Sequence, residues 1–268
     1  MEKKFKLGVI GAGFMATSII KGAINSKILS PESICVSDLN DEALSRMSGI
    51  GVNTTKDSAY LVNESEFVLF AVKPQNLDSV LNAISNSLCD KFISIMAGVK
   101  KEKIKKVFKN ACIARCMPNT PCAIGSGAVG LDCSDFINND DVEFVKNLLS
   151  SFASVVETKE EKMNAVTGVS GSSPAYFYLF LKGIIEAGVK QGLDYEAAKT
   201  LATSTMIGAG KMVLANKDKS LDELINAVCS KGGTTIEAIK VYQSEGLNLI
   251  TEKAIAACVK RAAELENL

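Results

Sequence analysis

The sequence contains no histidine and no strong excess of charge, and both absences exclude functions. Without imidazole the chain cannot use Ser-His-Asp or Cys-His catalysis, a histidine general base or a histidine-ligated metal. Thirty basic and thirty acidic residues cancel without a long run of either sign. We therefore expect no nucleic-acid partner. An apolar run of about 18 residues, which a transmembrane helix needs, is also missing, so we expect no membrane partner.

The eight cysteines form no C-x-x-C pair, which disfavours a disulfide framework and a zinc site. Because no histidine completes a ligand set either, we predict no metal. Reduced thiols are typical of the cytoplasm, where we expect this protein to act. Three glycines interrupt the apolar stretch 7–20 near the N-terminus, so we expect no signal peptide.

What the sequence does contain is an alternation of short apolar runs and helical patterns, which gives way to long helical patterns. Strands are predicted at 5–10, 33–37, 66–72, 91–96, 111–117 and 153–157. Helices are predicted at 14–24, 41–47, 76–88, 101–108 and 141–152, then at 173–191, 195–216, 220–228, 235–245 and 248–267. We predict an α/β fold in which a Rossmann-type parallel-sheet domain, 1–162, precedes an all-α domain, 163–268.

A glycine-rich turn, GAGFMA, follows the first predicted strand and opens the first predicted helix. In such a turn the first glycine permits a tight bend, the second lets the backbone approach a pyrophosphate, and the alanine allows close packing of helix and strand. A plain tight connection is the alternative, but the position in a βαβ series favours dinucleotide binding. The predicted contacts are Gly11, Ala12, Gly13, Phe14, Met15 and Ala16.

Asp38 ends the second predicted strand, 22 positions beyond Ala16. A carboxylate at this point accepts hydrogen bonds from ribose hydroxyls and repels a 2′-phosphate, which favours NADH. The alternative is a cap for the helix 41–47, for which Asp41 is also available. We favour the ribose role.

Two further strand ends are predicted at the same edge of the sheet, where cofactors lie in open α/β folds. The strand 66–72 runs into a lysine and a proline, and the strand 91–96 runs into a glycine. Lys73 could form a Schiff base or shuttle a proton, although a cation near phosphate is the simpler role. The predicted cofactor contacts here are Ala71, Val72, Lys73, Pro74, Met96, Ala97 and Gly98.

The segment KGGTT lies between two helical patterns in the second half. Gly232 and Gly233 allow backbone N–H groups to turn towards a ligand, and we expect Thr234 or Thr235 to cap the helix that follows. The residues lack the order of a triphosphate-binding loop, which favours a small carboxylate as the ligand. A simple turn between helices is the alternative.

Together these motifs resemble the pyrroline-5-carboxylate reductase family. The resemblance runs in order through GAGFMA, AVKP (71–74), RCMPNTP (115–121), AVTGVSGSSPAY (165–176) and SKGGTTIEAI (230–239). It therefore covers nearly the whole chain. At two positions the chain differs from the family's usual pattern, with Ser173 in place of a glycine and Lys231 in place of a proline.

The resemblance implies reduction of 1-pyrroline-5-carboxylate to L-proline by hydride transfer to a protonated cyclic imine, with NADPH as the default cofactor. It also implies a helical domain that dimerises through interlocking helices, with assembly into a decamer. Thr235 is the implied catalytic residue, because its hydroxyl reaches the imine nitrogen. The implied substrate-binding residues, supplied by the partner subunit, are Ser230, Gly232, Gly233, Thr234 and Thr235. Ser58 and Asn119 complete the predicted cofactor-binding set.

Two other functions stay open on the sequence alone. A β-hydroxyacid-type dehydrogenase has the same two-domain plan, but Lys182 lies too far along its helix to match that family's catalytic lysine. The second open function is that of a non-catalytic dinucleotide-sensing protein, whose helical half binds a protein partner. The sequence does not distinguish a five-membered from a six-membered imine.

Overall fold

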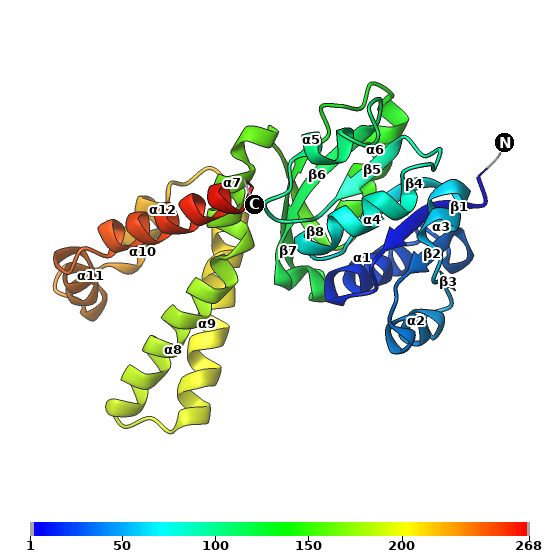
Figure 1. Cartoon of the computed structure of the whole chain (residues 1–268). Helices are drawn as coiled ribbons and strands as arrows, with labels where there is room; N and C mark the ends of the chain where they lie inside the picture. The colour runs from blue at the N-terminus through cyan, green and yellow to red at the C-terminus, as the bar shows by residue number, and fades with distance from the viewer. Residues whose placement is uncertain (1–2, 267–268) are drawn as a thin grey trace. The chain divides into compact units, whose positions relative to one another are not determined.

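The computed structural model describes residues 3–266, which divide into two compact units (Figure 1). The sheet unit comprises residues 3–172 together with 258–266, and the helical unit is Ser173–Ala257. The division of function at 162/163 stays a prediction, and residues 1, 2, 267 and 268 of its ranges lie outside the described residues.

An eight-stranded sheet forms the centre of the sheet unit. Its strands are β1 (Phe5–Ile10), β2 (Ile34–Ser37), β3 (Asn53–Thr55), β4 (Ser65–Phe70), β5 (Lys91–Ser94), β6 (Cys112–Pro118), β7 (Gly127–Asp132) and β8 (Ala153–Glu157). The order is β3-β2-β1-β4-β5-β6-β7-β8, and every neighbouring pair is parallel except β6 with β7. The predicted Rossmann-type, mostly parallel sheet is confirmed.

Helices cover both faces of this sheet. They are α1 (Phe14–Asn25), α2 (Asp41–Ser48) and α6 (Asn139–Ser150) on one face, and α3 (Ser58–Glu64), α4 (Leu77–Ile84) and α5 (Lys101–Lys105) on the other. The first core contains Leu7, Ile19 and Val36, and the second contains Phe70 stacked on Phe92. Because both faces are covered, the central strands β1, β2 and β4 are largely apolar in the sequence.

Short helices connect these elements and lead into the helical unit. They are η1 (Pro31–Ser33), η2 (Pro74–Asn76), η3 (Thr120–Ile124), η4 (Glu160–Lys162), α7 (Met163–Val166) and a π-helical turn, η5 (Thr167–Gly171). The π-helical turn packs closely against β6, since a Cβ at Gly171 would lie 2.5 Å from the methyl carbon of Met117.

The helical unit consists only of helices among the residues described. They are α8 (Ser173–Lys190), α9 (Tyr195–Ala215), α10 (Leu221–Val228), α11 (Thr234–Ser244) and the first part of α12 (Leu247–Leu265), whose residues from Cys258 onward belong to the sheet unit. The five predicted helices are therefore confirmed, although the last predicted residue of the fifth, 267, lies outside the described residues. No helix within 3–266 is long and apolar enough to span a membrane.

Candidate functional site: a pocket at the carboxyl edge of the sheet

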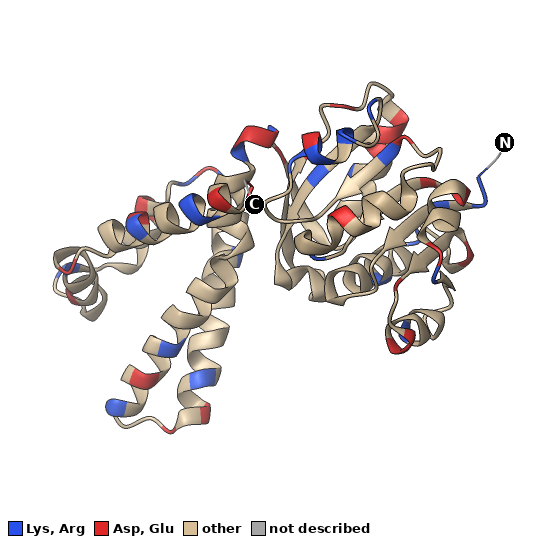
Figure 2. Cartoon of the chain, viewed as in Figure 1, with Lys and Arg blue, Asp and Glu red and all other residues tan. Residues whose placement is uncertain are grey.

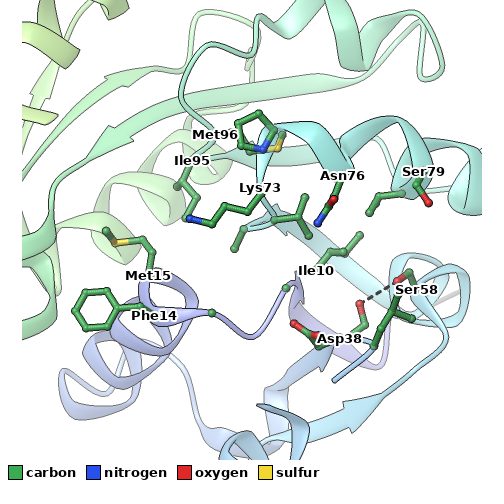
Figure 3. A pocket seen from close by; sticks show the side chains of 18 of the residues that line it. Ile10, Phe14, Met15, Asp38, Ser58, Lys73, Asn76, Ser79, Ile95 and Met96 are labelled. Carbon is green, nitrogen blue, oxygen red and sulfur yellow. Dashed lines mark hydrogen bonds between the residues drawn. The ribbon is translucent and has the colours of Figure 1, made fainter. Parts of the chain in front are cut away.

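A pocket lies at the carboxyl ends of β1, β2, β4 and β5, and all its lining residues come from the sheet unit. Figure 3 shows that it has two chemically different ends, since Asp38 and Ser58 lie at one and Phe14 and Met15 at the other. Lys73 extends across the pocket towards Ile95. A molecule with a polar sugar at one end and an aromatic ring at the other matches this arrangement, which is the plan of a dinucleotide site.

The glycine turn forms the floor of this pocket between β1 and α1. Gly11 has a φ of +103°, and a Cβ there would lie 2.7 Å from the carbonyl oxygen of Ala71, so only glycine fits. Gly13 caps α1 and has no atom within 4 Å of a Cβ built on it. The space in front of the helix N-terminus is therefore open, and the binding of phosphate there stays a prediction.

Asp38 is fixed by backbone amides on both sides. Its Oδ2 accepts the N–H of Ala12 at 2.7 Å, and its Oδ1 accepts the N–H of Asn40 at 2.9 Å. The cap of α2 is Asn40, whose side chain accepts the N–H of Ala43, so neither Asp38 nor Asp41 has this role. The carboxylate thus joins the glycine turn to the end of β2 and lines the pocket.

Ser58 begins α3 and lies beside the end of β2. Its Oγ is 3.1 Å from the Oγ of Ser37, a pair drawn as the dashed line in Figure 3. Both hydroxyls line the pocket next to Asp38. They are neutral donors and acceptors, suited to ribose hydroxyls.

The segments after β4 and β5 form the opposite wall. The N–H of Ala71 donates to Ile10 O at 2.9 Å, which extends the β1–β4 ladder to the pocket. Val72, Lys73 and Pro74 line the wall, and η2 begins at the proline. These predicted positions therefore all meet at the pocket.

After β5 the chain passes the pocket through Met96 and Ala97, and Gly98 follows with a φ of +70°. Asn119 has a different environment. Its side-chain amide donates weakly to Ser170, at 3.3 Å from the carbonyl oxygen, and its Oδ1 accepts the N–H of Ala128 at 3.0 Å. These bonds hold the turn after β6, and its contact with a cofactor stays a prediction.

Several residues that line the pocket were not predicted from the sequence. They are Ile10, Ser37, Leu39, Asn76, Ser79, Val80, Ile95 and Pro118. Most are neighbours of predicted positions, but Asn76, Ser79 and Val80 come from η2 and α4. The signal that could have revealed them is the polar first turn of the helix after a strand end.

The KGGTT segment belongs to the helical unit and differs from the prediction in one respect. The cap of α11 is Gly233, which has no side chain, while Thr234 and Thr235 are the first two helical residues. The expected threonine cap is therefore wrong, because the chain becomes helical one residue earlier. Gly232 adopts a φ of +71°, and Gly233 N–H donates to Ser230 O at 3.0 Å.

The cysteines are free thiols. Burial raises the pKa of Cys35 to about 11 and also raises the pKa of Cys116. Neither is therefore a thiolate at neutral pH, which is the form that binds metal. Within residues 3–266 no three His, Cys, Asp or Glu side chains come together as a metal site.

The fold and the pocket are those of the Rossmann-type class of dinucleotide-binding proteins, whose ligand site lies at the switch point of the sheet. A family described as pyrroline-5-carboxylate reductase dimerisation matches residues 160–265, and one described as NADP oxidoreductase coenzyme F420-dependent matches residues 6–98. A curated pyrroline-5-carboxylate reductase of Haemophilus influenzae is 36% identical over 266 residues, which cover 98% of each chain. This chain belongs to the pyrroline-5-carboxylate reductase family.

Other similar proteins agree with this assignment. The pyrroline-5-carboxylate reductase of Arabidopsis thaliana is 34% identical over 98% of this chain and 96% of its own. A solved reductase of this family from Coxiella burnetii superimposes with a TM-score of 0.91 at 32% identity, over 98% of this chain and 99% of the other. A Plasmodium falciparum pyrroline carboxylate reductase, solved with NADP bound, has a TM-score of 0.87 at 28% identity, over 99% and 100%.

Proposed function

We propose that this protein reduces 1-pyrroline-5-carboxylate to L-proline with NADH or NADPH. The observation that carries the proposal is the pocket at the carboxyl edge of the sheet, with its glycine turn, in a chain that belongs to this reductase family. The residues present fit a dinucleotide, because Gly13 leaves space for phosphate and Asp38 with Ser58 offers polar groups to a ribose. When bound, the dinucleotide supplies the hydride.

The protein's own contribution is to bind and orient, with no histidine to act as an acid. An imine that arrives protonated becomes a neutral amine on accepting hydride, so no alkoxide has to be stabilised and no strong acid is required. The glycine turn and Lys73 hold the phosphate region, while the backbone at Met96 and Ala97 lines the reacting end. Rate enhancement then comes from positioning and from the electrostatics of the closed site.

The substrate is bound by the KGGTT segment of the partner subunit in this proposal. The Thr235 hydroxyl reaches the imine nitrogen, and the N–H groups of Gly233 and Thr234 bind the carboxylate, with Ser230 and Gly232 shaping the loop. Two features support an anion site. The first turn of α11 has no side-chain cap, and the positive end of a helix dipole lies there. Because Gly233 N–H donates to Ser230 O, this bond must open when the carboxylate binds.

The cofactor preference follows from Asp38 in this proposal. Its carboxylate lines the end of the pocket where a 2′-phosphate would lie, and its own hydrogen bonds are to neutral amides. Lys56, the cation after β3, pairs with Asp41 at 2.7 Å instead. A 2′-phosphate would be repelled, so NADH is used well, and NADPH less well or at best equally.

The assembly is a homodimer with interlocked helical units, of the kind that builds a decamer in this family. The dimerisation family match supports an oligomer. The protein acts in the cytoplasm, where its thiols stay reduced. Residues 1–162 bind the dinucleotide, and residues 163–268 dimerise and bind the substrate.

Imine-dependent oxidation of NADH and NADPH by the purified protein tests this proposal. We expect rapid oxidation of the dinucleotide with 1-pyrroline-5-carboxylate and formation of L-proline. The same assay with the six-membered imine measures the preference for ring size. A β-hydroxyacid-type dehydrogenase would instead reduce NAD with a β-hydroxyacid. A dinucleotide sensor would bind NADH and oxidise none of it, and either outcome would sink the proposal.

A further inference from the structure

A group of buried charges lies outside the pocket, at the end of α12. Glu266 follows that helix, with its N–H bonded to Ala262 O at 3.2 Å and only 7% of its side chain exposed. Its Oε1 accepts Arg115 Nη2 at 2.8 Å, and its Oε2 lies 3.4 Å from Lys100 Nζ. One carboxylate therefore joins the last turn of α12 to β6 and to the segment before α5.

Arg115 is the centre of this group. Its side chain, in β6, is only 4% exposed. Besides Glu266 it pairs with Glu160, whose Oε1 lies 3.1 Å from Nη1 and also accepts the N–H of Lys101 at 2.8 Å. Two carboxylates thus satisfy one buried guanidinium, and both also hold the chain at 100–101. Breaking a buried pair by removing one partner leaves the other charge uncompensated.

The pair persists at neutral pH. Burial opposes ionisation of Glu266, but hydrogen bonds from Arg115 and Asn164 and the charge of Lys100 lower the pKa of its carboxyl below the ordinary value. Glu266 is therefore a carboxylate whenever the protein is folded near neutrality.

The segment held in this way is the one that borders the pocket. Met96 and Ala97 line the pocket, and Gly98 comes next with a φ of +70°. A Cβ at Gly98 would lie 3.2 Å from the Cβ of Leu265, the residue before Glu266. The last turn of α12 therefore packs on the loop 95–100 at Gly98 and forms an ion pair with it at Lys100. Only Ala97 separates the first of these contacts from Met96.

We propose that Glu266 is a positioning residue for the dinucleotide. By anchoring Arg115 and Lys100, it holds the loop 95–100 in the shape that places the backbone of Met96 and Ala97 along the pocket. The inference rests on the proposed function only in requiring that the pocket binds a dinucleotide. Its effect is on dinucleotide affinity, because the bonds are to the loop and none is to a reacting atom.

The test compares Glu266→Gln with Glu264→Gln in the same turn. Glu264 is 48% exposed and pairs only with Arg261 on its own helix among the contacts of residues 3–266, so it is a matched control. NADH titration without imine, followed by the fluorescence of the bound dinucleotide, gives Kd. We expect Glu266→Gln to raise the Kd by about fivefold and Glu264→Gln to leave it unchanged. In turnover, the KM for NADH should rise in parallel while kcat changes little.

Lys100→Met provides a second variant that leaves Glu266 itself intact. It removes the ion pair between the loop and Glu266, and we expect it to raise the Kd for NADH in the same direction, by about twofold. An unchanged Kd in both variants, with only a lower melting temperature, would mean that Glu266 stabilises the fold and positions nothing. A wild-type protein that binds neither NADH nor NADPH overturns the inference too. Binding without imine-dependent oxidation would overturn the proposed reaction alone.

Discussion

The two units of this chain bury their apolar residues to very different degrees. In the sheet unit the side chains of β1, β4 and β5 are almost fully enclosed by helices on both faces. In the helical unit only Ser173, Ile185 and Ala198 are buried. Large apolar residues along its helices, among them Phe177, Leu179, Leu214 and Ile250, are more than half exposed.

Charged side chains are also absent from long stretches of two helices in the helical unit. Residues 173–181 of α8 and 200–210 of α9 carry no charged side chain, and these stretches are tan in Figure 2. An exposed apolar surface of this extent is rare on a monomer and marks a surface that another chain covers. The sheet unit therefore completes its own core. In the proposed dimer the helical unit is part of a core that a second subunit completes, which agrees with the dimerisation family match.

The largest effect should come from a charge placed on the exposed apolar surface of the helical unit. Leu179→Asp buries a carboxylate in the dimer, so we expect monomers and a loss of activity of about 10³-fold. Dinucleotide binding by the sheet unit should survive. Sedimentation velocity and the reductase assay measure both results.

The matched control is Leu88→Asp, since Leu88 is 85% exposed in the sheet unit and Leu179 is 72% exposed in the helical unit. It should leave assembly and activity intact. A dimeric, active Leu179→Asp protein would contradict the idea that the helical unit is an incomplete core.

The next effect separates the chemistry of the two units. Thr235→Ala removes a hydroxyl from the first turn of α11. We expect kcat to fall by about 10²-fold with the Kd for NADH unchanged, because in our proposal the hydroxyl contacts the imine and not the dinucleotide. Thr235→Ser keeps the hydroxyl and should keep most of the activity. Equal turnover by the alanine variant would remove Thr235 from the mechanism.

A third effect should be confined to the sheet unit. Gly11→Ala forces a left-handed residue against Ala71 O, with a Cβ only 2.7 Å away. We expect a loss of stability of about 1–3 kcal/mol and a weakening of NADH binding by about thirtyfold. Thermal unfolding and NADH titration measure these changes. Gly13→Ala, which has open space, should unfold at the wild-type temperature, and equal destabilisation of both would contradict this reading of the turn.

The smallest effect concerns the cofactor. Asp38→Asn keeps the shape that accepts the N–H of Ala12 but removes the charge. We expect the KM for NADPH to fall by about fivefold while the KM for NADH changes little. A wild type that strongly prefers NADPH, with no change in the variant, would show that Asp38 only fixes the turn.

The elements that the sequence predicts well are those with an uninterrupted apolar or helical pattern. The strands β1, β4 and β5 and the helices α8, α9 and α12 are of this kind. The missed elements lack it. The helix α3, SAYLVNE, is only seven residues long. The missed strands are β3, an edge strand of three polar residues, and β7, GAVGLD, which contains two glycines. Their pairing is decided by the neighbouring strand, which is tertiary information.

The site follows the same rule. Strand ends and a glycine turn are local signals, and they predict the pocket at Gly11, Lys73 and Met96. The bond between Glu266 and Arg115 joins residues 151 positions apart and leaves no local pattern. The prediction of a threonine as the N-cap of α11 was wrong for a related reason. Nothing in the local sequence distinguishes a helix that begins at Thr234 from one that begins later.

In the proposed mechanism, each active site combines the pocket of one subunit with the KGGTT segment of the other. Complementation between two inactive variants tests it directly. Gly13→Asp places a carboxylate in the open phosphate space of the pocket, and Thr235→Ala disables the KGGTT segment. Mixed dimers of the two contain one site with both defects and one with none. We predict recovery of about a quarter of wild-type activity after subunit exchange at equal amounts, since about half the dimers are mixed. Activity no greater than that of the two separate variants would contradict the shared site.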